Sequence, residues 1–184
     1  MKPMYLDGFT TQRLIIRPVS ERDIPLWTDF FIDNSFFEYI GLDINTGACD
    51  HSSNWINRQL KRYAANDYGL MALVASDSME MVGQCGLITM NVENSRELEV
   101  GYHIISRYQG KGYATEAASF FRDWVFENNL ADIFIAIIHV DNLGSQAVAK
   151  KLGLRRERET VCMNKPSYRY VMSRSEWKEM VLSD

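Results

Sequence analysis

Residues 97–127 read ELEVGYHIISRYQGKGYATEAASFFRDWVFE, and they combine three structural signals in one short stretch. Polar and apolar residues alternate over residues 97–105, which is typical of a β-strand with one buried face. A turn with two closely spaced glycines, Gly110 and Gly112, comes next. From Ala114 onward, apolar residues recur at helical spacing, which predicts a helix with one face against a core. The stretch therefore predicts a strand, a glycine-rich turn and a helix.

The glycine turn is suited to binding an anion such as a phosphate. Glycines let several backbone N–H groups point at one ligand, and the N-terminus of the following helix adds a partial positive charge. Gly110-Lys111-Gly112 is not a P-loop, because the following Ser/Thr and the four-residue spacing are missing. It is not the dinucleotide fingerprint either, because the third glycine is missing. On the glycines alone, a plain strand-to-helix turn is the alternative.

The rest of the chain predicts a mixed α/β fold, with one domain over residues 1–184, since 184 residues match the size of a single domain. We expect irregular structure over residues 33–49. Gly83 and Gly86 lie inside a predicted strand and indicate a bulge or a close backbone approach. The predicted strands are 14–17, 70–75, 81–89, 97–105, 133–140, about 155–163 and 168–173; the predicted helices start near residues 20, 52 and 114, and a short one covers 145–152.

The composition argues against several classes of protein. The net charge of −4 argues against a dedicated nucleic-acid binder, which is usually basic. No apolar run reaches the roughly 18 residues of a membrane span, and residues 1–8 have no apolar segment typical of a signal peptide. The three cysteines form no Cys-x-x-Cys pair, which fits free thiols and a cytoplasmic location. The three histidines lie far apart in the sequence, so we expect no metal site.

Residues 109–114, Gln-Gly-Lys-Gly-Tyr-Ala, match the Gln/Arg-x-x-Gly-x-Gly/Ala signature of the GNAT superfamily of N-acetyltransferases. Further segments resemble the RimJ/RimL-type branch of that superfamily, which is typified by enzymes that acetylate the N-termini of ribosomal proteins. These segments are Thr11–Leu14 with Arg17-Pro18, Glu99–Tyr102, Gly112–Ala117, Asn142–Ser145 and Lys151–Leu154. The resemblance covers about residues 10–173. It implies the GNAT fold, with a mixed, mostly antiparallel central sheet, a splayed strand pair and flanking helices.

The resemblance also implies acetyl-CoA as the acetyl donor, with no metal. The glycine loop and the start of the helix would bind the pyrophosphate. The backbone of the preceding strand would pair with the pantetheine arm, which enters where this strand splays from the strand at 133–140. The residues assigned to the cofactor are Tyr102, His103, Ile104, Gln109, Gly110, Lys111, Gly112, Tyr113, Ala114, Thr115 and Asn142.

The reaction implied by this family is attack of a neutral amine on a thioester, which needs a base, a stabilised oxyanion and a proton for the departing thiolate. Glu99 resembles the strand carboxylate that serves as the base, usually through a water molecule. An ordinary solvated strand acid is the alternative for Glu99. Glu97 shares its face of the strand and is the second candidate. His103 also lies on that face, where a structural histidine is the simpler interpretation.

The residues implied to stabilise the departing thiolate differ from those of many GNAT enzymes. Many GNAT enzymes carry a tyrosine seven residues after the position of Asn142, and here that position is Ala149. In the RimL-like branch a serine three residues after the asparagine takes its place, and Ser145 matches it. Ser145 would donate a proton or hydrogen-bond the sulfur, and both Asn142 and Ser145 also suit a helix cap. Cys85 and Cys162 are predicted core or strand residues rather than nucleophiles.

The acceptor is predicted to be a protein or peptide N-terminal α-amine. Near pH 7.4, deprotonation costs about 0.7 kcal/mol for an α-amine and about 4 kcal/mol for a lysine side chain. Small-molecule amines such as antibiotics, polyamines or amino-acid analogues are the alternative acceptors, and a non-catalytic acyl-CoA-binding domain is the alternative function. A nucleotide-phosphate enzyme would need a metal-binding acid near the loop, and none is evident. The pocket would be built by the two N-terminal helices and the hairpin at 162–170. We expect no direct nucleic-acid or membrane partner, and a homodimer is left open.

Overall fold

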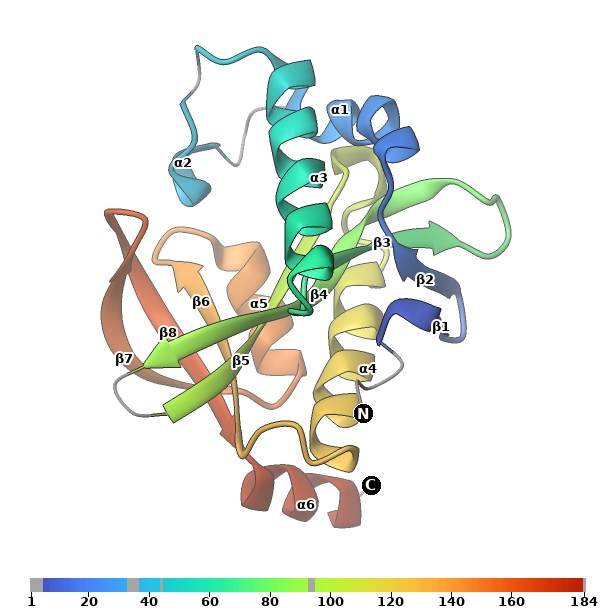
Figure 1. The fold of residues 1–184 in the computed structure, drawn as a ribbon. Coiled ribbons are helices and arrows are strands. Elements are labelled where there is room, and N and C mark those ends of the chain that lie inside the picture. Colours follow the sequence, from blue (N-terminus) through green and yellow to red (C-terminus); the bar gives the residue numbers. More distant parts are fainter. Residues whose placement is uncertain (1–4, 33–36, 44, 93–94, 184) are drawn as a thin grey trace.

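The computed structural model describes residues 5–32, 37–43, 45–92 and 95–183, and its centre is an eight-stranded sheet with helices on both faces (Figure 1). The strand order is β1-β2-β3-β4-β5-β6-β8-β7, and only β5 and β6 pair in parallel. The strands are β1 (Phe9–Thr10), β2 (Leu14–Pro18), β3 (Leu70–Ala75), β4 (Met81–Val92), β5 (Ser95–Ile104), β6 (Ile133–His139), β7 (Arg155–Cys162) and β8 (Lys165–Ser173). The helices are α1 (Ile24–Ile32), α2 (Phe37–Ile40), α3 (Ala48–Ala64), α4 (Tyr113–Glu127), α5 (Leu143–Lys151) and α6 (Arg174–Ser183), with short 3₁₀ turns at Tyr5–Asp7, Glu21–Asp23 and Ser106–Tyr108.

The predicted fold class is confirmed, and the differences from the predicted elements lie where packing outweighs local pattern. The segment predicted to be irregular contains α2 and the first two residues of α3; residues 33–36 and 44 of that segment lie outside the described residues. Helix α6 is not among the elements predicted from the sequence. Its Trp177 indole donates to Asp123 at 2.8 Å and packs against Phe126, with ring centroids 5.4 Å apart. Both contacts join Trp177 to residues far away in the sequence, so the local sequence pattern does not predict the helix.

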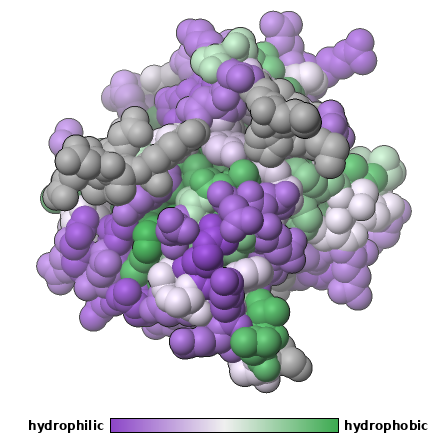
Figure 2. Space-filling view, turned by 60° about the horizontal axis from the view of Figure 1, so that its bottom comes forward, coloured by the Kyte–Doolittle hydropathy of each residue, from purple (hydrophilic) through white to green (hydrophobic). Residues whose placement is uncertain are grey.

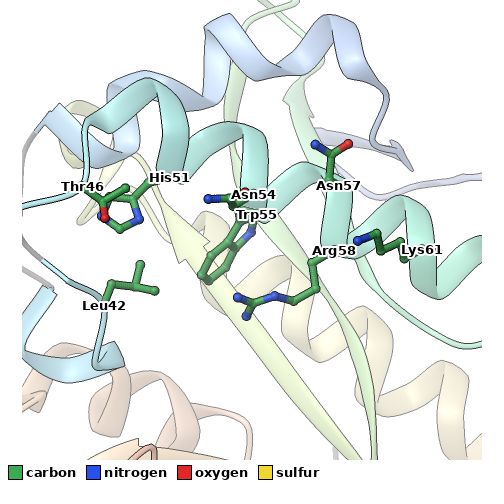
Figure 3. A pocket seen from close by; sticks show the side chains of 8 residues that line it. All are labelled: Leu42, Thr46, His51, Asn54, Trp55, Asn57, Arg58 and Lys61. Carbon is green, nitrogen blue, oxygen red and sulfur yellow. The ribbon is translucent and has the colours of Figure 1, made fainter.

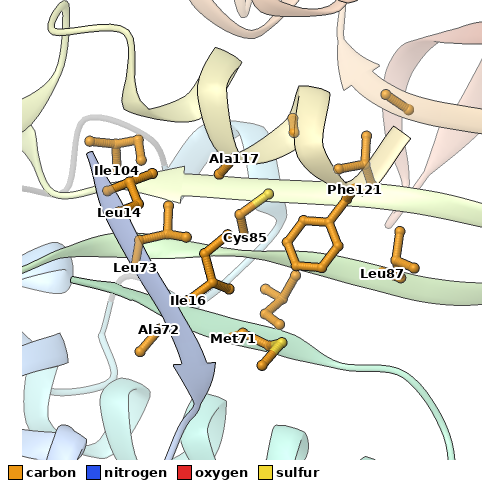
Figure 4. Close-up of a cluster of buried hydrophobic side chains, with 14 of the residues drawn as sticks. Leu14, Ile16, Met71, Ala72, Leu73, Cys85, Leu87, Ile104, Ala117 and Phe121 are labelled. Atoms are coloured by element: carbon orange, nitrogen blue, oxygen red, sulfur yellow. The ribbon is translucent and has the colours of Figure 1, made fainter. Parts of the chain in front are cut away.

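The two faces of the sheet carry different side chains. On one face, Leu14, Leu73 and Cys85 point toward Ala117 and Phe121 of α4, and all five are fully buried (Figure 4). On the other face, the His103 ring of β5 contacts aromatic rings of α1 and α3. Its centroid is 5.7 Å from that of Phe30 and 4.9 Å from that of Trp55. The alternation predicted for β5 is therefore confirmed, and it directs Glu97, Glu99 and His103 toward α1 and α3.

Strands β5 and β6 touch over a short stretch and then diverge. Their register pairs only Leu98 with Phe134 and Glu99 with Ile135. Beyond these positions β5 stays paired with β4 as far as Ile104, whereas β6 stays paired with β8 as far as His139. Each strand thus keeps one neighbour and loses the other, and a wedge-shaped opening starts just after Glu99. The splayed strand pair implied by the resemblance is confirmed.

The surface that faces the viewer in Figure 2 is largely hydrophilic, with separate small apolar areas. Large apolar side chains that are exposed in the described part of the chain belong to different elements: Leu26, Ile32, Met79, Leu143, Val161, Met163, Val181 and Leu182. Among the described helices, none combines the length and the apolar content that crossing a membrane requires. A homodimer stays a prediction that these observations do not test.

Gly83 allows β4 and β5 to approach each other beside the opening. A Cβ atom at this position would lie 2.4 Å from the His103 carbonyl oxygen, which is backbone and cannot rotate away. We expect Gly83→Ala to lower the free energy of unfolding by about 1–3 kcal/mol, the usual cost of overpacking. Chemical denaturation measures this change. Gly144→Ala is the matched control, because its Cβ would meet no atom closer than 3.8 Å. Equal stability of the two variants would contradict the close approach.

Candidate active site

The glycine loop leaves several backbone N–H groups without helical partners. Gly110 and Gly112 have φ angles of +74° and +87°, a left-handed conformation that side chains other than glycine rarely adopt. The first hydrogen bond of α4 runs from the Glu116 N–H to the Gly112 carbonyl, so the N–H groups of residues 113–115 precede the helical ladder. Together with the dipole of α4, they form a site suited to an anion. The Gln109 side chain donates to the Ile104 carbonyl at 3.0 Å and joins the loop to the end of β5.

Arg13, which lies about 100 residues earlier in the chain, contacts this loop and helix α4. This contact was not predicted from the sequence. The Arg13 guanidinium donates to the Lys111 carbonyl at 2.9 Å and to the Glu116 carboxylate at 2.6 Å, and it lies over the Tyr113 ring at 4.9 Å. Glu116 also accepts from the Thr11 hydroxyl at 2.6 Å and from the Arg13 backbone at 2.7 Å. Both segments were noted for their family resemblance, but no sequence signal pairs residues 103 positions apart.

Glu99 sits on β5 at the last paired position before the opening. Its side chain is half-buried. Burial raises the pKa of Glu99 from 4.5 to about 7, and a hydrogen bond from the Ile137 backbone and the positive charge of Arg62 oppose part of this rise. Glu99 is therefore not an ordinary solvated strand acid. A carboxylate with a pKa near neutrality is suited to accepting and releasing a proton at physiological pH.

Glu97 and His103, the other titratable residues on this face of β5, differ from Glu99 in their surroundings. Glu97 is buried, and both of its carboxylate oxygens lie 2.7 Å from one guanidinium nitrogen of Arg169 on β8. Arg169 also pairs with Glu157 of β7, so Glu97 belongs to a structural ion-pair network. Burial lowers the pKa of His103 to about 4, which keeps its imidazole neutral at physiological pH. Of the three, Glu99 alone combines an open position with a pKa near 7.

Asn142 and Ser145 meet at the start of α5. The Asn142 side chain accepts from the Ser145 backbone N–H at 3.0 Å, so the predicted helix cap at Asn142 is confirmed. The Tyr102 hydroxyl of β5 donates to the Ser145 carbonyl at 2.9 Å, which fixes this turn beside the opening. Ala149, which replaces the tyrosine of many GNAT enzymes, is fully buried.

A pocket of about 620 Å³ opens along α3 (Figure 3). Its lining residues are Leu42, Thr46, His51, Asn54, Trp55, Asn57, Arg58 and Lys61. Trp55 links this pocket to the face of the sheet that carries Glu99. Its ring contacts His103, which lies on the same face of β5 as Glu99. On the hairpin side, burial and the nearby charge of Glu99 raise the pKa of the Cys162 thiol. The pocket is lined by residues 42–61 and includes no residue of the hairpin at 162–170, so the acceptor site built by the N-terminal helices and this hairpin stays a prediction.

Cys85 is fully buried against α4, and burial raises the pKa of its thiol well above the usual value. The predicted core position of Cys85 is thus confirmed. The described residues contain no group of three or more His, Cys, Asp or Glu side chains placed to hold a metal ion.

Comparison with known proteins identifies the family. The sequence profile described as "Acetyltransferase (GNAT) domain" matches residues 13–155. The chain therefore belongs to the GNAT family of acetyltransferases, and it is an acyltransferase enzyme. The family uses acetyl-CoA as its donor.

Two relatives in Bacillus subtilis show how far the sequence similarity extends. The uncharacterized protein YkkB is 30% identical over 159 residues, which cover 85% of this chain and 90% of YkkB. The uncharacterized N-acetyltransferase YnaD is 26% identical over 148 residues, which cover 80% of this chain and 82% of YnaD. Neither name states an acceptor.

Solved structures share the fold at low sequence identity. RimJ of Mycobacterium smegmatis, in complex with CoA-disulfide, has a TM-score of 0.78 at 20% identity and covers 96% of this chain and 91% of its own. A GNAT-family acetyltransferase of Bacillus anthracis has a TM-score of 0.76 at 22% identity, with coverage of 92% and 99%. RimL, a ribosomal L7/L12 alpha-N-protein acetyltransferase in complex with coenzyme A, has a TM-score of 0.74 at 14% identity, with coverage of 89% and 95%.

The burial of Glu99 makes a prediction about stability. Because its pKa is about 7 in the fold and 4.5 ordinarily, the folded protein binds more protons between these values, and stability falls as pH rises through this window. Glu99→Gln removes this dependence. Relative to wild type, we expect the variant to gain up to about 3 kcal/mol between pH 4.5 and 7.5, at about 1.4 kcal/mol per pKa unit.

Urea denaturation at a series of pH values measures this difference. The matched control is Glu159→Gln, which removes an exposed carboxylate from β7. Stability curves of wild type and Glu99→Gln that stay parallel across the pH range would contradict the burial of Glu99.

Proposed function

We propose that this protein transfers the acetyl group of acetyl-CoA to a primary amine by direct attack, and that the acceptor is the N-terminal α-amine of a protein or peptide. The observation that carries the proposal is the position of Glu99, whose pKa is about 7 and which lies where β5 and β6 diverge. This position supports Glu99 as the base, because it is the last paired position of β5 before the two strands diverge.

The geometry of the donor side supports this proposal. The Ile105 N–H donates to the Val82 carbonyl of β4 at 3.0 Å. Backbone groups alternate in direction along a strand, so Tyr102 and Ile104 direct theirs away from β4 and into the opening. His103 directs its backbone toward β4 instead, so the assignment of the pantetheine arm rests on Tyr102 and Ile104. The pyrophosphate is assigned to the loop at residues 109–115, whose N–H groups precede the α4 ladder.

When bound, acetyl-CoA supplies the thioester carbonyl that the amine attacks and the thiolate that leaves. Glu99 accepts the amine proton, directly or through a water molecule. A base with a pKa near 7 is half ionised at neutral pH and is well matched to an α-amine, whose own pKa is about 7.7–8.0.

Ser145 is assigned to the thiolate side. Asn142 caps α5 by accepting from the Ser145 backbone N–H, so the Ser145 hydroxyl is not needed for the cap. The hydrogen bond from the Tyr102 hydroxyl to the Ser145 carbonyl holds the turn beside the opening. We assign the Ser145 hydroxyl to a hydrogen bond with the sulfur, which stabilises the departing thiolate.

The proposal of an α-amine acceptor rests on the cost of deprotonating the amine and on structural similarity to RimL. A single carboxylate is sufficient for an α-amine but faces a cost of about 4 kcal/mol for a lysine side chain at pH 7.4. RimL, which shares this fold, is a ribosomal L7/L12 alpha-N-protein acetyltransferase. Acetylation of small-molecule amines is the second candidate, and the pocket of about 620 Å³ is large enough for one.

The loop assignment predicts the behaviour of Gly112. We expect Gly112→Asp to abolish acetyl-CoA binding, because the side chain places negative charge and bulk where the backbone approaches the pyrophosphate. Gly112→Ala is the matched control, since it introduces the same backbone strain at φ +87° without the charge. The control should weaken binding by about tenfold or less. Calorimetric titration measures both affinities, and equal affinities for the two variants would remove the loop from the binding site.

The base assignment predicts a pH-dependent loss of activity in Glu99→Gln. We expect kcat/KM for a peptide α-amine to fall by about 10²-fold at pH 6.5, the low end of the range for a positioned base. The loss should shrink toward pH 9.5, because the free amine then forms without help. The measurement is thiol release from acetyl-CoA, with peptide α-amines, lysine side chains and small amines compared under the same conditions.

Glu159→Gln serves again as the control and should keep wild-type kinetics. A loss of less than about threefold at pH 6.5 would show that Glu99 is not the base. A large loss that does not change with pH would make Glu99 a positioning residue. Binding of acetyl-CoA without release of thiol for any acceptor would instead favour the non-catalytic acyl-CoA-binding domain.

A further inference from the structure

One side of α3 presents positive charge to the acceptor side of the sheet. Trp55, Arg58 and Arg62 recur at spacings of three and four residues, which places them on one face of the helix. Trp55 contacts His103 of β5, and the Arg58 guanidinium lies 5.8 Å from the centre of the Trp55 ring. Figure 3 shows both side chains projecting from α3 on the pocket side. Arg62, one turn further along, acts on Glu99 through its charge.

These cations form no ion pair with a carboxylate in the described part of the chain, although the charge of Arg62 acts on Glu99. The pocket lining includes Arg58 and Lys61, and none of its members, all in the described part of the chain, is acidic. Within residues 5–32, 37–43, 45–92 and 95–183, no ion pair is recorded for Arg58, Lys61 or Arg62.

Several other arginines in the described part of the chain are paired with carboxylates. Arg13 pairs with Glu116, and Arg169 pairs with Glu97 and Glu157. Glu97, the second carboxylate on the Glu99 face of β5, is thereby occupied and does not offset the charge on α3. The pocket along α3 therefore has an excess of positive charge, supplied by Arg58 and Lys61, that no acidic lining residue offsets.

This charge has a consequence for the acceptor. An amine arrives mostly protonated at neutral pH, and two or three cations along its path disfavour an acceptor with no compensating charge. An anionic group on the same acceptor turns that repulsion into attraction and orients the amine. An arginine fork is well matched to a carboxylate, which it binds through charge-assisted hydrogen bonds.

We propose that the acceptor carries a carboxylate close to its amine, and that Arg58 and Arg62 bind this carboxylate while Glu99 faces the amine. The inference rests on the proposed function, since it names the acceptor class for the same site. The carboxylate has two potential sources: the side chain of an acidic residue next to a peptide N-terminus, or the carboxylate of a free amino acid. Both present the same chemistry to α3.

The test compares carboxylate-bearing ligands with their amides by isothermal calorimetry, in the presence of coenzyme A. The peptide arm uses N-acetylated peptides that begin Ser-Asp or Ser-Asn and are otherwise identical. The small-molecule arm uses N-acetylaspartate and the corresponding diamide. For wild type we expect the carboxylate to bind at least about tenfold more tightly than the amide in one arm, as a charged hydrogen bond provides. The arm that shows this preference identifies the source.

The variants are Arg58→Gln and Arg62→Gln, singly and together, with Lys178→Gln on α6 as the control that removes an exposed positive charge elsewhere. We expect the carboxylate-to-amide ratio to fall below about threefold in the double variant and to stay at the wild-type value in the control. Thermal unfolding confirms that each variant is folded.

No preference for the carboxylate in either arm, or a preference that survives the double variant, would overturn the inference. These outcomes are distinct from failure of the proposed function, which appears as the absence of thiol release with any acceptor. The binding ratio remains measurable in that event, so the two failures are separable.

Discussion

The divergence of β5 from β6 is the constraint on which the rest of the site depends. Two residue pairs hold these strands together, and beyond Glu99 and Ile135 each strand stays with its other neighbour. The right-handed twist of the sheet carries the two halves further apart with every residue. The opening that results has strand backbone along one wall, the start of α5 at the other, and Glu99 where the walls meet. The glycine loop lies beyond Ile104 at the end of the same strand, so β5, the loop and α4 follow one another along the chain.

Two carboxylates on the same face of β5 show how position determines chemistry. Glu97 lies where β5 is still covered, and Arg169 binds both of its oxygens. Glu99, two residues on, has no such partner among the contacts recorded for it and keeps a pKa of about 7, because burial there is only partly offset by Ile137 and Arg62. The ion pair of Glu97 with Arg169 links β5 to β8 across the intervening strand β6, whereas Glu99 is the carboxylate that we propose as the base.

The N-terminal segment contributes to the donor side as well as to the core. Arg13 precedes β2, whose Leu14 and Ile16 are fully buried, so the position of Arg13 is determined by the packing of that strand. From there its guanidinium reaches Lys111 and Glu116 and holds the loop against the body of the protein. The charge on α3 has a similar origin, since Trp55 anchors the helix and Arg58 and Arg62 follow from its orientation. In both cases a buried neighbour determines where an exposed cation points.

The sequence by itself determined the fold class, the glycine loop, the order of nearly all strands and the face of β5 that carries Glu99, because periodicity and glycine chemistry are local properties. It also identified Asn142 as a helix cap, which depends on residues three positions apart. Only the tertiary structure distinguishes the surroundings of Glu97 and Glu99, since Glu97 is bound by Arg169, 72 residues further along the chain. The tertiary structure likewise determines the contacts of Arg13 with the loop, the helix α6 and the unpaired cations of α3. Each depends on contacts between residues far apart in the sequence, and burial and charge are determined only when the chain has folded.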